Sequence, residues 1–197
     1  DGRMKSREGT VVDADNLMDE LRNLAITEIR SRHEDWSDDE VADTAEKIQN
    51  AAWKFFLLQT SPKKTITFDA KKSIAFEGAT GPYLQYAAVR IQSMLRKVDR
   101  SDAGDPTVLG DAEKPLGVKL LQFAPAIERG AENLNPTYVL TYLLELAQDW
   151  SSYYASTPVL NADDPIVRAA RITLAQKVLA TLETGMQILG FDAPERM

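Results

Sequence analysis

Two tyrosines and an arginine fall on one face of a predicted helix, where they could bind an unstacked nucleobase. Residues 77–97 read EGATGPYLQYAAVRIQSMLRK. At about 100° per residue, Tyr83, Tyr86 and Arg90 fall together, roughly 120° away from the apolar stripe of this helix. Aromatic rings stack on single-stranded bases, and a guanidinium binds phosphate. The alternative is that both tyrosines pack against a neighbouring helix and that Arg90 is solvated.

The helix that positions these side chains is expected to begin near Thr80 or Gly81. Thr80 can cap the helix, and Pro82 suits its first turn because no N–H is needed there. An amphipathic helix requires an apolar stripe, and the stripe here consists of Leu84, Ala88, Ile91, Leu95 and Val98.

A second candidate site is the polar segment 1–10, DGRMKSREGT. Its guanidinium, ammonium and hydroxyl groups could hold phosphates by charge and hydrogen bonds. The residues concerned are Arg3, Met4, Lys5, Ser6 and Arg7. The alternative is a frayed, solvated terminus.

The composition excludes several kinds of site. The 197 residues include no cysteine, so neither a disulfide nor a thiolate metal site can form. The single histidine, His33, rules out a two-histidine metal site, and we expect it at the surface or at a helix cap. No Walker loop, dinucleotide fingerprint, nucleophile elbow, signal peptide or membrane-spanning apolar run is present. The net charge of −7 argues against non-specific coating of nucleic acid but allows a local basic face.

The remaining segments predict an all-α fold, a multi-helix bundle with at most one short strand, near residues 65–68. Capping residues and apolar periodicity indicate further helices over about 13–32, 37–58, 69–74, 116–131, 135–154 and 164–189. Pro125 predicts a kink or a break in one of them. Segment 99–115 is acidic and contains Gly and Pro, so we expect a mobile linker whose charges are only solvated.

Three separated stretches together resemble the C-terminal part of the class I arginyl-tRNA synthetases. Residues 2–12, GRMKSREGTVV, resemble the KMSKS-type loop of that family. The run FDA…FEGATGPYLQYAAVR, within 67–90, is similar to the glycine-proline-tyrosine motif at the entry of its anticodon-binding domain. The tail LGFDAPERM looks like the C-terminus of the family, and helix 163–189 is similar to the last helix of its DALR-type bundle.

The resemblance implies two regions, a KMSKS-like loop with connecting helices over 1–78 and a DALR-type anticodon-binding bundle over 79–197. It implies a cytoplasmic parent enzyme that attaches arginine to its tRNA with ATP and magnesium. The nucleotide-binding fold of the family, with its HIGH motif, would precede residue 1. We therefore expect this chain alone to be inactive, to hold no cofactor and to be a monomer. Its partner would be the anticodon arm of arginine tRNA, and no membrane is implied.

The resemblance also assigns site residues by position. Those that would steady the ATP phosphates are Arg3, Met4, Lys5, Ser6 and Arg7. Those that would contact the anticodon loop are Tyr83, Tyr86 and Arg90, with Tyr154 and Met197 lining the pocket for the central anticodon base. Lys5 stands where the family often has serine, Ala88 where many relatives carry histidine, and Pro158 where some place an aromatic residue.

Two other interpretations remain open. The chain could be a helical protein-interaction scaffold without nucleic-acid binding, whose aromatic residues are all core. It could also be the C-terminal helical domain of a sister class I synthetase, such as the cysteinyl or methionyl enzyme. The GPYLQY stretch and the final PERM favour the arginyl family, and a HIGH-type motif upstream would decide for a synthetase.

Overall fold

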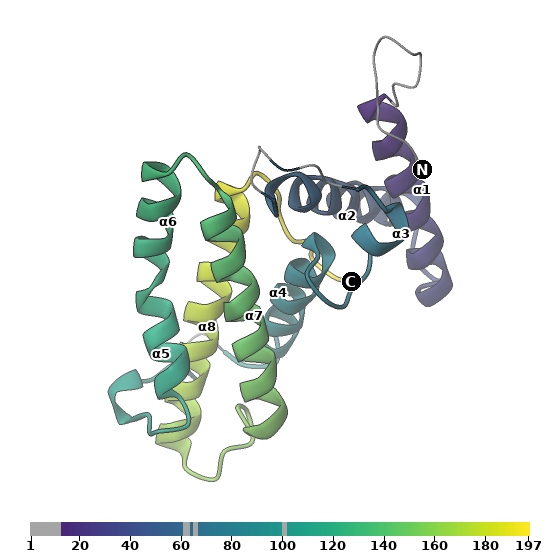
Figure 1. The fold of residues 1–197 in the computed structure, drawn as a ribbon. Coiled ribbons are helices and arrows are strands. Elements are labelled where there is room, and N and C mark those ends of the chain that lie inside the picture. The colour runs from purple at the N-terminus through teal and green to yellow at the C-terminus, as the bar shows by residue number, and fades with distance from the viewer. Residues whose placement is uncertain (1–12, 61–63, 65–66, 100–101) are drawn as a thin grey trace.

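The computed structural model describes residues 13–60, 64, 67–99 and 102–197, and each regular element in these ranges is helical (Figure 1). The elements are α1 (Ala14–Arg32), α2 (Asp38–Leu58), α3 (Ala70–Ser73), α4 (Gly81–Leu95), the 3-10 helix η3 (Pro106–Val108), α5 (Lys114–Leu121), α6 (Phe123–Glu132), α7 (Thr137–Ser156) and α8 (Pro165–Ile188). The all-α prediction is thus confirmed for the described chain. Of the expected strand, residues 65–66 lie outside the description, and Lys64, Thr67 and Phe68 are not in a strand. None of the described helices is long and apolar enough to cross a membrane.

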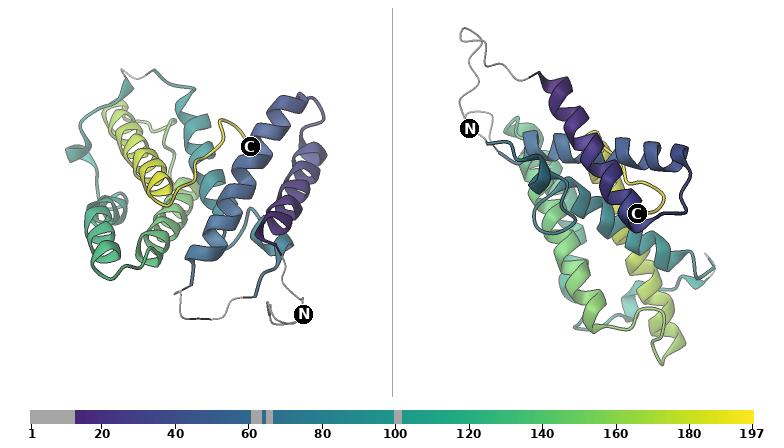
Figure 2. Two further views of the ribbon diagram at one scale, coloured as in Figure 1. Left: turned by 90° about the horizontal axis from the view of Figure 1, so that it is seen from above. Right: turned by 90° about the vertical axis from the view of Figure 1, so that its right-hand side faces the viewer.

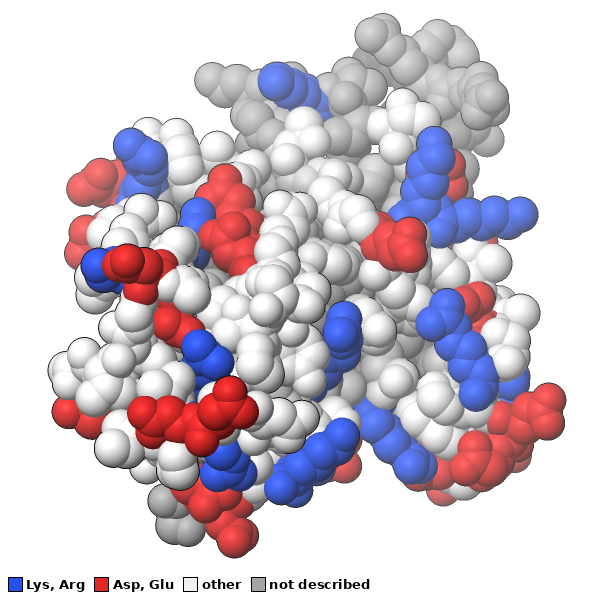
Figure 3. All heavy atoms as spheres, turned by 90° about the horizontal axis from the view of Figure 1, so that it is seen from below, with Lys and Arg blue, Asp and Glu red and all other residues white. Residues whose placement is uncertain are grey.

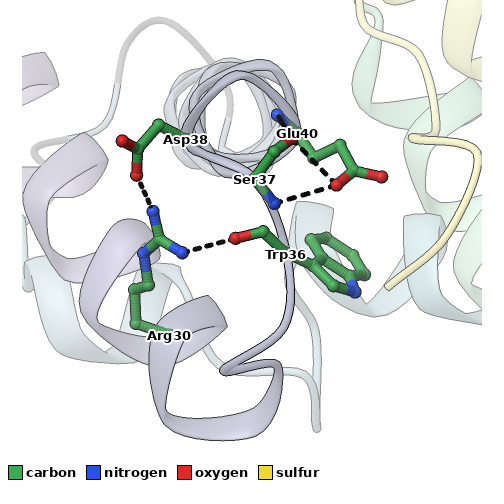
Figure 4. A network of polar contacts seen from close by, with 5 residues as sticks. All are labelled: Arg30, Trp36, Ser37, Asp38 and Glu40. Carbon is green, nitrogen blue, oxygen red and sulfur yellow. Dashed lines mark hydrogen bonds and ion pairs between the residues drawn. The ribbon is translucent and has the colours of Figure 1, made fainter.

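Side-chain caps form at several of the predicted helix starts. The N-cap side chains that accept a backbone N–H of the first turn include those of Asp13, Ser37, Asp69, Thr80 and Asp164. At α2 the cap is reciprocal, because Ser37 accepts from the Glu40 N–H and the Glu40 carboxylate accepts from the Ser37 N–H at 2.9 Å (Figure 4). The bond from the Ser37 backbone holds the pKa of Glu40 below its usual value.

Pro125 accounts for the break between α5 and α6. A proline cannot donate to the carbonyl four residues earlier, and its ring clashes with that carbonyl. That carbonyl belongs to Leu121, which is the last residue of α5, and α6 begins at Phe123. The predicted break is confirmed, and it places Pro125 in the first turn of α6, where a proline is tolerated.

The helices form two groups with α4 between them. In the views of Figures 1 and 2, α1 and α2 lie side by side in one group, and α5 to α8 form the other. α4 packs against α2 on one side and against α7 and α8 on the other. The main core joins α4, α7 and α8, and α2 contributes Ala51 and Phe55 to it. α4 is therefore the central helix, and its side chains can face both groups.

Gly81 allows α4 to approach α2 closely. A Cβ atom at this position would collide with the backbone carbonyl of Ala51. The absence of a side chain at Gly81 therefore provides space for the α2 backbone. Gly78 has a φ of +79°, in the left-handed region that favours glycine.

The C-terminal tail returns from α8 to the α1–α2 group. Gly190, with a φ of +83°, follows the end of α8, where a left-handed residue commonly ends a helix. The amide nitrogen of Gln85, a fully buried residue of α4, donates to the carbonyls of Lys47 (2.9 Å) and Asp192 (2.6 Å). Gln85 thereby ties α2, α4 and the tail together, and the tail ends beside α1 and α2 (Figure 2).

The expectation that the charges of segment 99–115 are only solvated is wrong for Glu113. This carboxylate is 4% exposed and accepts hydrogen bonds from Tyr153 Oη (3.0 Å), Arg171 Nε (2.9 Å) and the Gly110 N–H (3.1 Å). Burial, followed by the nearby Glu113 charge, raises the pKa of Tyr153. Glu113 thus links this segment to α7 and α8 by a buried polar network.

Candidate nucleic-acid interface

Arg90 lies between two tyrosine rings that belong to different helices. Tyr86 and Arg90 are one turn apart on α4, and Tyr154 lies near the C-terminal end of α7. The Cζ atom of Arg90 is 5.5 Å from the ring centroid of Tyr86 and 5.9 Å from that of Tyr154. Both distances lie within the range of cation–π attraction, so the rings hold the guanidinium in place. The structure therefore brings these three predicted residues together, and their ligand stays a prediction.

Tyr154 presents a supported aromatic surface. Its side chain is exposed and stacks on Trp150, with ring centroids 5.9 Å apart and an interplanar angle of 24°. Trp150 is 3% exposed and belongs to the main core. The hollow between Arg90 and Tyr154 has a volume of only about 10 Å³. A base bound here would therefore stack on the outer face of Tyr154 instead of entering the protein.

Other positions singled out in the sequence lie away from this pair of rings. Tyr83 is half-buried and packs against the main core, which is the alternative we considered for it. Ala88 is fully buried in the same core, so its side chain cannot reach a ligand. Pro158 is exposed, and its carbonyl accepts a hydrogen bond from Arg171 at 3.0 Å.

Met197 lies on the other side of Tyr86. It is half-buried and packs against the small core of α1 and α2. Met197 and Tyr86 both line a cavity of about 240 Å³ between the end of α1, α4 and the tail. Tyr86 thus separates this cavity from the Arg90–Tyr154 surface.

The predicted phosphate-binding residues of the N-terminal loop, from Arg3 to Arg7, lie outside the described residues. Their role stays a prediction. The described residues contain no group of three His, Asp or Glu side chains arranged as metal ligands.

Several residues that the sequence did not assign to the site line the 240 Å³ cavity, among them Arg32, Trp36 and Phe76. His33, expected at the surface or at a cap, is the C-cap of α1 and also lines the cavity. The sequence contained a pattern that predicts packing of Trp36 at the start of α2. An apolar residue just before an N-cap often packs on the fourth helical residue, and here Trp36 and Val41 share one apolar cluster around Ser37.

A second arginine–tyrosine pair lies at the other end of α7. Arg129 Cζ is 5.6 Å from the ring centroid of Tyr138, beside a wide groove between α6 and α7. Three carboxylates, those of Glu128, Glu132 and Glu145, line this groove and would repel phosphates. On the face of the molecule in Figure 3, Lys and Arg are interspersed with Asp and Glu, so this face has no large patch of one charge. The groove beside Arg129 is therefore poorly suited to an anionic ligand.

Comparison with known proteins identifies the family of the chain. The DALR anticodon binding domain family matches residues 84–197. An arginine–tRNA ligase of Flavobacterium psychrophilum is 37% identical over the whole chain, which covers 33% of that protein. The Thermus thermophilus arginyl-tRNA synthetase structure superposes with a TM-score of 0.90 at 35% identity, over 100% of this chain and 34% of its own.

The Plasmodium falciparum arginyl-tRNA synthetase structure shares the fold, with a TM-score of 0.81 at 19% identity, over 95% of this chain and 34% of its own. The chain thus spans about a third of the length of the relatives it matches. The family match covers more than half of the chain and includes α7, α8 and nearly all of α4. The chain belongs to the DALR anticodon-binding domain family.

Proposed function

We propose that this chain binds the anticodon arm of arginine tRNA as the RNA-binding part of an arginine–tRNA ligase. The observation that carries the proposal is the position of Arg90 between the rings of Tyr86 and Tyr154. The family match to residues 84–197 and the similarity to arginine–tRNA ligases support it.

The chemistry of the surface suits an unstacked loop base. Proteins that recognise single-stranded RNA splay its bases and stack them on aromatic rings, which contributes about 1–3 kcal/mol per base. Tyr154 offers such a ring, backed by Trp150. Arg90 is exposed, and its guanidinium can donate charge-assisted hydrogen bonds to a phosphate or a base edge. Stacking and charge thus act on the same nucleotide.

The remaining predictions concern the longer enzyme. We infer that it attaches arginine to its tRNA with ATP and magnesium, that it acts as a cytoplasmic monomer, and that the loop from Arg3 to Arg7 steadies the ATP phosphates. We also keep the division into regions 1–78 and 79–197 as a proposal, although α2 contributes Ala51 and Phe55 to the main core.

The test is a binding titration with a labelled anticodon stem-loop of arginine tRNA. We expect saturable binding to the wild-type chain, and weaker binding when the central anticodon base is replaced. Arg90→Gln should weaken binding about five- to tenfold, since one charge-assisted contact is lost. If the chain binds neither RNA, the protein-interaction scaffold becomes the better account.

A further inference from the structure

The last turn of α7 carries Tyr154 at the surface and Tyr153 in the core. Neighbouring residues of a helix point about 100° apart, so the two rings lie on different sides of the same turn. The loop to α8 follows directly, at the lower end of both helices in Figure 1. A helix end frays unless it is held, because its last four carbonyls lack helical partners. The direction in which Tyr154 points therefore depends on what holds this turn.

Contacts from other parts of the chain hold the end of α7. Tyr153 is 7% exposed, and its Oη donates to Oε1 of Glu113 at 3.0 Å. The same carboxylate oxygen accepts from Nε of Arg171 at 2.9 Å. Nη1 of Arg171 donates to the carbonyl of Pro158, just after the helix, at 3.0 Å. One buried ion pair thus binds both the last turn of α7 and the loop that follows it.

These contacts reach the exposed ring of Tyr154 through Trp150. The ring centroid of Trp150 lies 5.7 Å from that of Tyr153 and 5.9 Å from that of Tyr154. The Tyr154 ring in turn lies 5.9 Å from the guanidinium carbon of Arg90. A stacking surface that is already in place binds more tightly than one that must first be ordered, because binding then costs less conformational entropy.

We propose that Glu113 and Arg171 are positioning residues for RNA binding. They hold Tyr153 in place and, through it, the stacking ring of Tyr154. The inference rests on the proposed function and extends it to residues that do not contact the RNA. Glu113 is 4% exposed, so its carboxylate acts only through its neighbours.

The test removes the hydroxyl of Tyr153 and measures RNA affinity. Tyr153→Phe deletes the hydrogen bond to Glu113 but keeps the ring in the core. Glu113 keeps its bonds from Arg171 and from the Gly110 N–H, so no buried charge is left unpaired. A titration with the labelled anticodon stem-loop of arginine tRNA should show binding weakened about three- to fivefold, because the last turn of α7 is less well ordered.

Tyr142→Phe is the matched control. Tyr142 is likewise a buried tyrosine of α7, and its hydroxyl donates to the Lys119 carbonyl at 2.9 Å. It lies about three turns before Tyr154, so its loss should lower stability to a similar degree and leave RNA affinity unchanged. Far-ultraviolet circular dichroism of both variants checks that each is folded during the titration.

Further variants show whether Tyr153 acts through Tyr154. In a Tyr154→Leu background the stacking ring is absent, so Tyr153→Phe should cause no further loss of affinity. Arg171→Lys keeps the positive charge, but its single nitrogen replaces a planar guanidinium that donates to both Glu113 and the Pro158 carbonyl. This change should weaken RNA binding about threefold.

The inference would be overturned, with the proposed function intact, if Tyr153→Phe bound as tightly as wild type or lost no more affinity than Tyr142→Phe. The same holds if Tyr153→Phe lost the same factor in the Tyr154→Leu background. A wild-type chain that binds no stem-loop overturns both the inference and the proposed function.

Discussion

The guanidinium of Arg90 lies 5.9 Å from the ring centroid of Tyr154, across the contact between α4 and α7. The two residues are distant in sequence, and the packing of two helices on one core brings them together. A charge held over an exposed ring offers a base both a stacking surface and a hydrogen-bond donor. The proposed binding face therefore depends on the relative position of α4 and α7.

We expect Arg90 and Tyr154 to act together in RNA binding. Arg90→Gln and Tyr154→Leu should each weaken binding of the stem-loop. The double variant should lose less than the sum of the two, with a coupling of about 0.5–1 kcal/mol, because each residue positions the other. A double-mutant cycle of dissociation constants measures this coupling, and strictly additive losses would show that the residues act independently.

Gly81→Ala should destabilise the fold. The added Cβ collides with the Ala51 carbonyl, so α4 must move away from α2, and we expect a loss of about 1–3 kcal/mol in the free energy of unfolding. Gly117→Ala is the matched control. Gly117 lies inside α5 with nothing near its added Cβ, so alanine there should be neutral or stabilise by up to about 1 kcal/mol. Urea unfolding measures the stability of both variants, and equal stabilities would refute the role given to Gly81.

Glu113→Gln should destabilise the chain by about 2–4 kcal/mol, because it leaves Arg171 without its buried charge partner. Asp111→Asn removes a carboxylate that pairs with Lys114 at an exposed position, and the expected loss is below about 1 kcal/mol. Chemical denaturation measures both. A loss for Glu113→Gln no greater than that for Asp111→Asn would mean that the buried network does not stabilise the segment.

The capping box of α2 should make stability depend on acid. The pKa of Glu40 is lower in the folded chain than in the unfolded chain, mainly through the Ser37 backbone hydrogen bond. Its contribution is therefore present above the unfolded pKa and is lost as the pH falls through the folded pKa. We expect the stability difference between wild type and Glu40→Gln to shrink between about pH 6 and pH 3. A difference independent of pH would contradict this assignment.

Much of the fold follows from local sequence signals. Ser37 with Glu40, Thr80 with Pro82, and Asp164 with Pro165 mark helix starts by side-chain chemistry that acts within a few residues. The role of Glu113 could not be predicted from local sequence, because its partners Tyr153 and Arg171 lie on α7 and α8 and come close to it only when these helices pack.

Part of the site could also be predicted from local sequence. Tyr86 and Arg90 share a helix face, so their proximity follows from helical periodicity. The resemblance to the synthetase family added Tyr154 and Met197. The cavity walls Trp36 and Phe76 depend on how α1, α3 and the tail meet, which no single segment encodes. Tyr83 was predicted on the same helix face, but its side chain is half-buried against the main core.

The central claim is that the RNA binds where Tyr154 lies, and α7 itself provides the control. Tyr154 and Tyr138 are 38% and 37% exposed, and each has an arginine near its ring, Arg90 and Arg129. The measurement is the dissociation constant of the arginine anticodon stem-loop for Tyr154→Leu and Tyr138→Leu, at one salt concentration. We predict that Tyr154→Leu weakens binding about tenfold, as expected for one lost stacking contact, and that Tyr138→Leu binds as wild type does. Equal effects of the two changes, or a loss confined to Tyr138→Leu, would contradict the account.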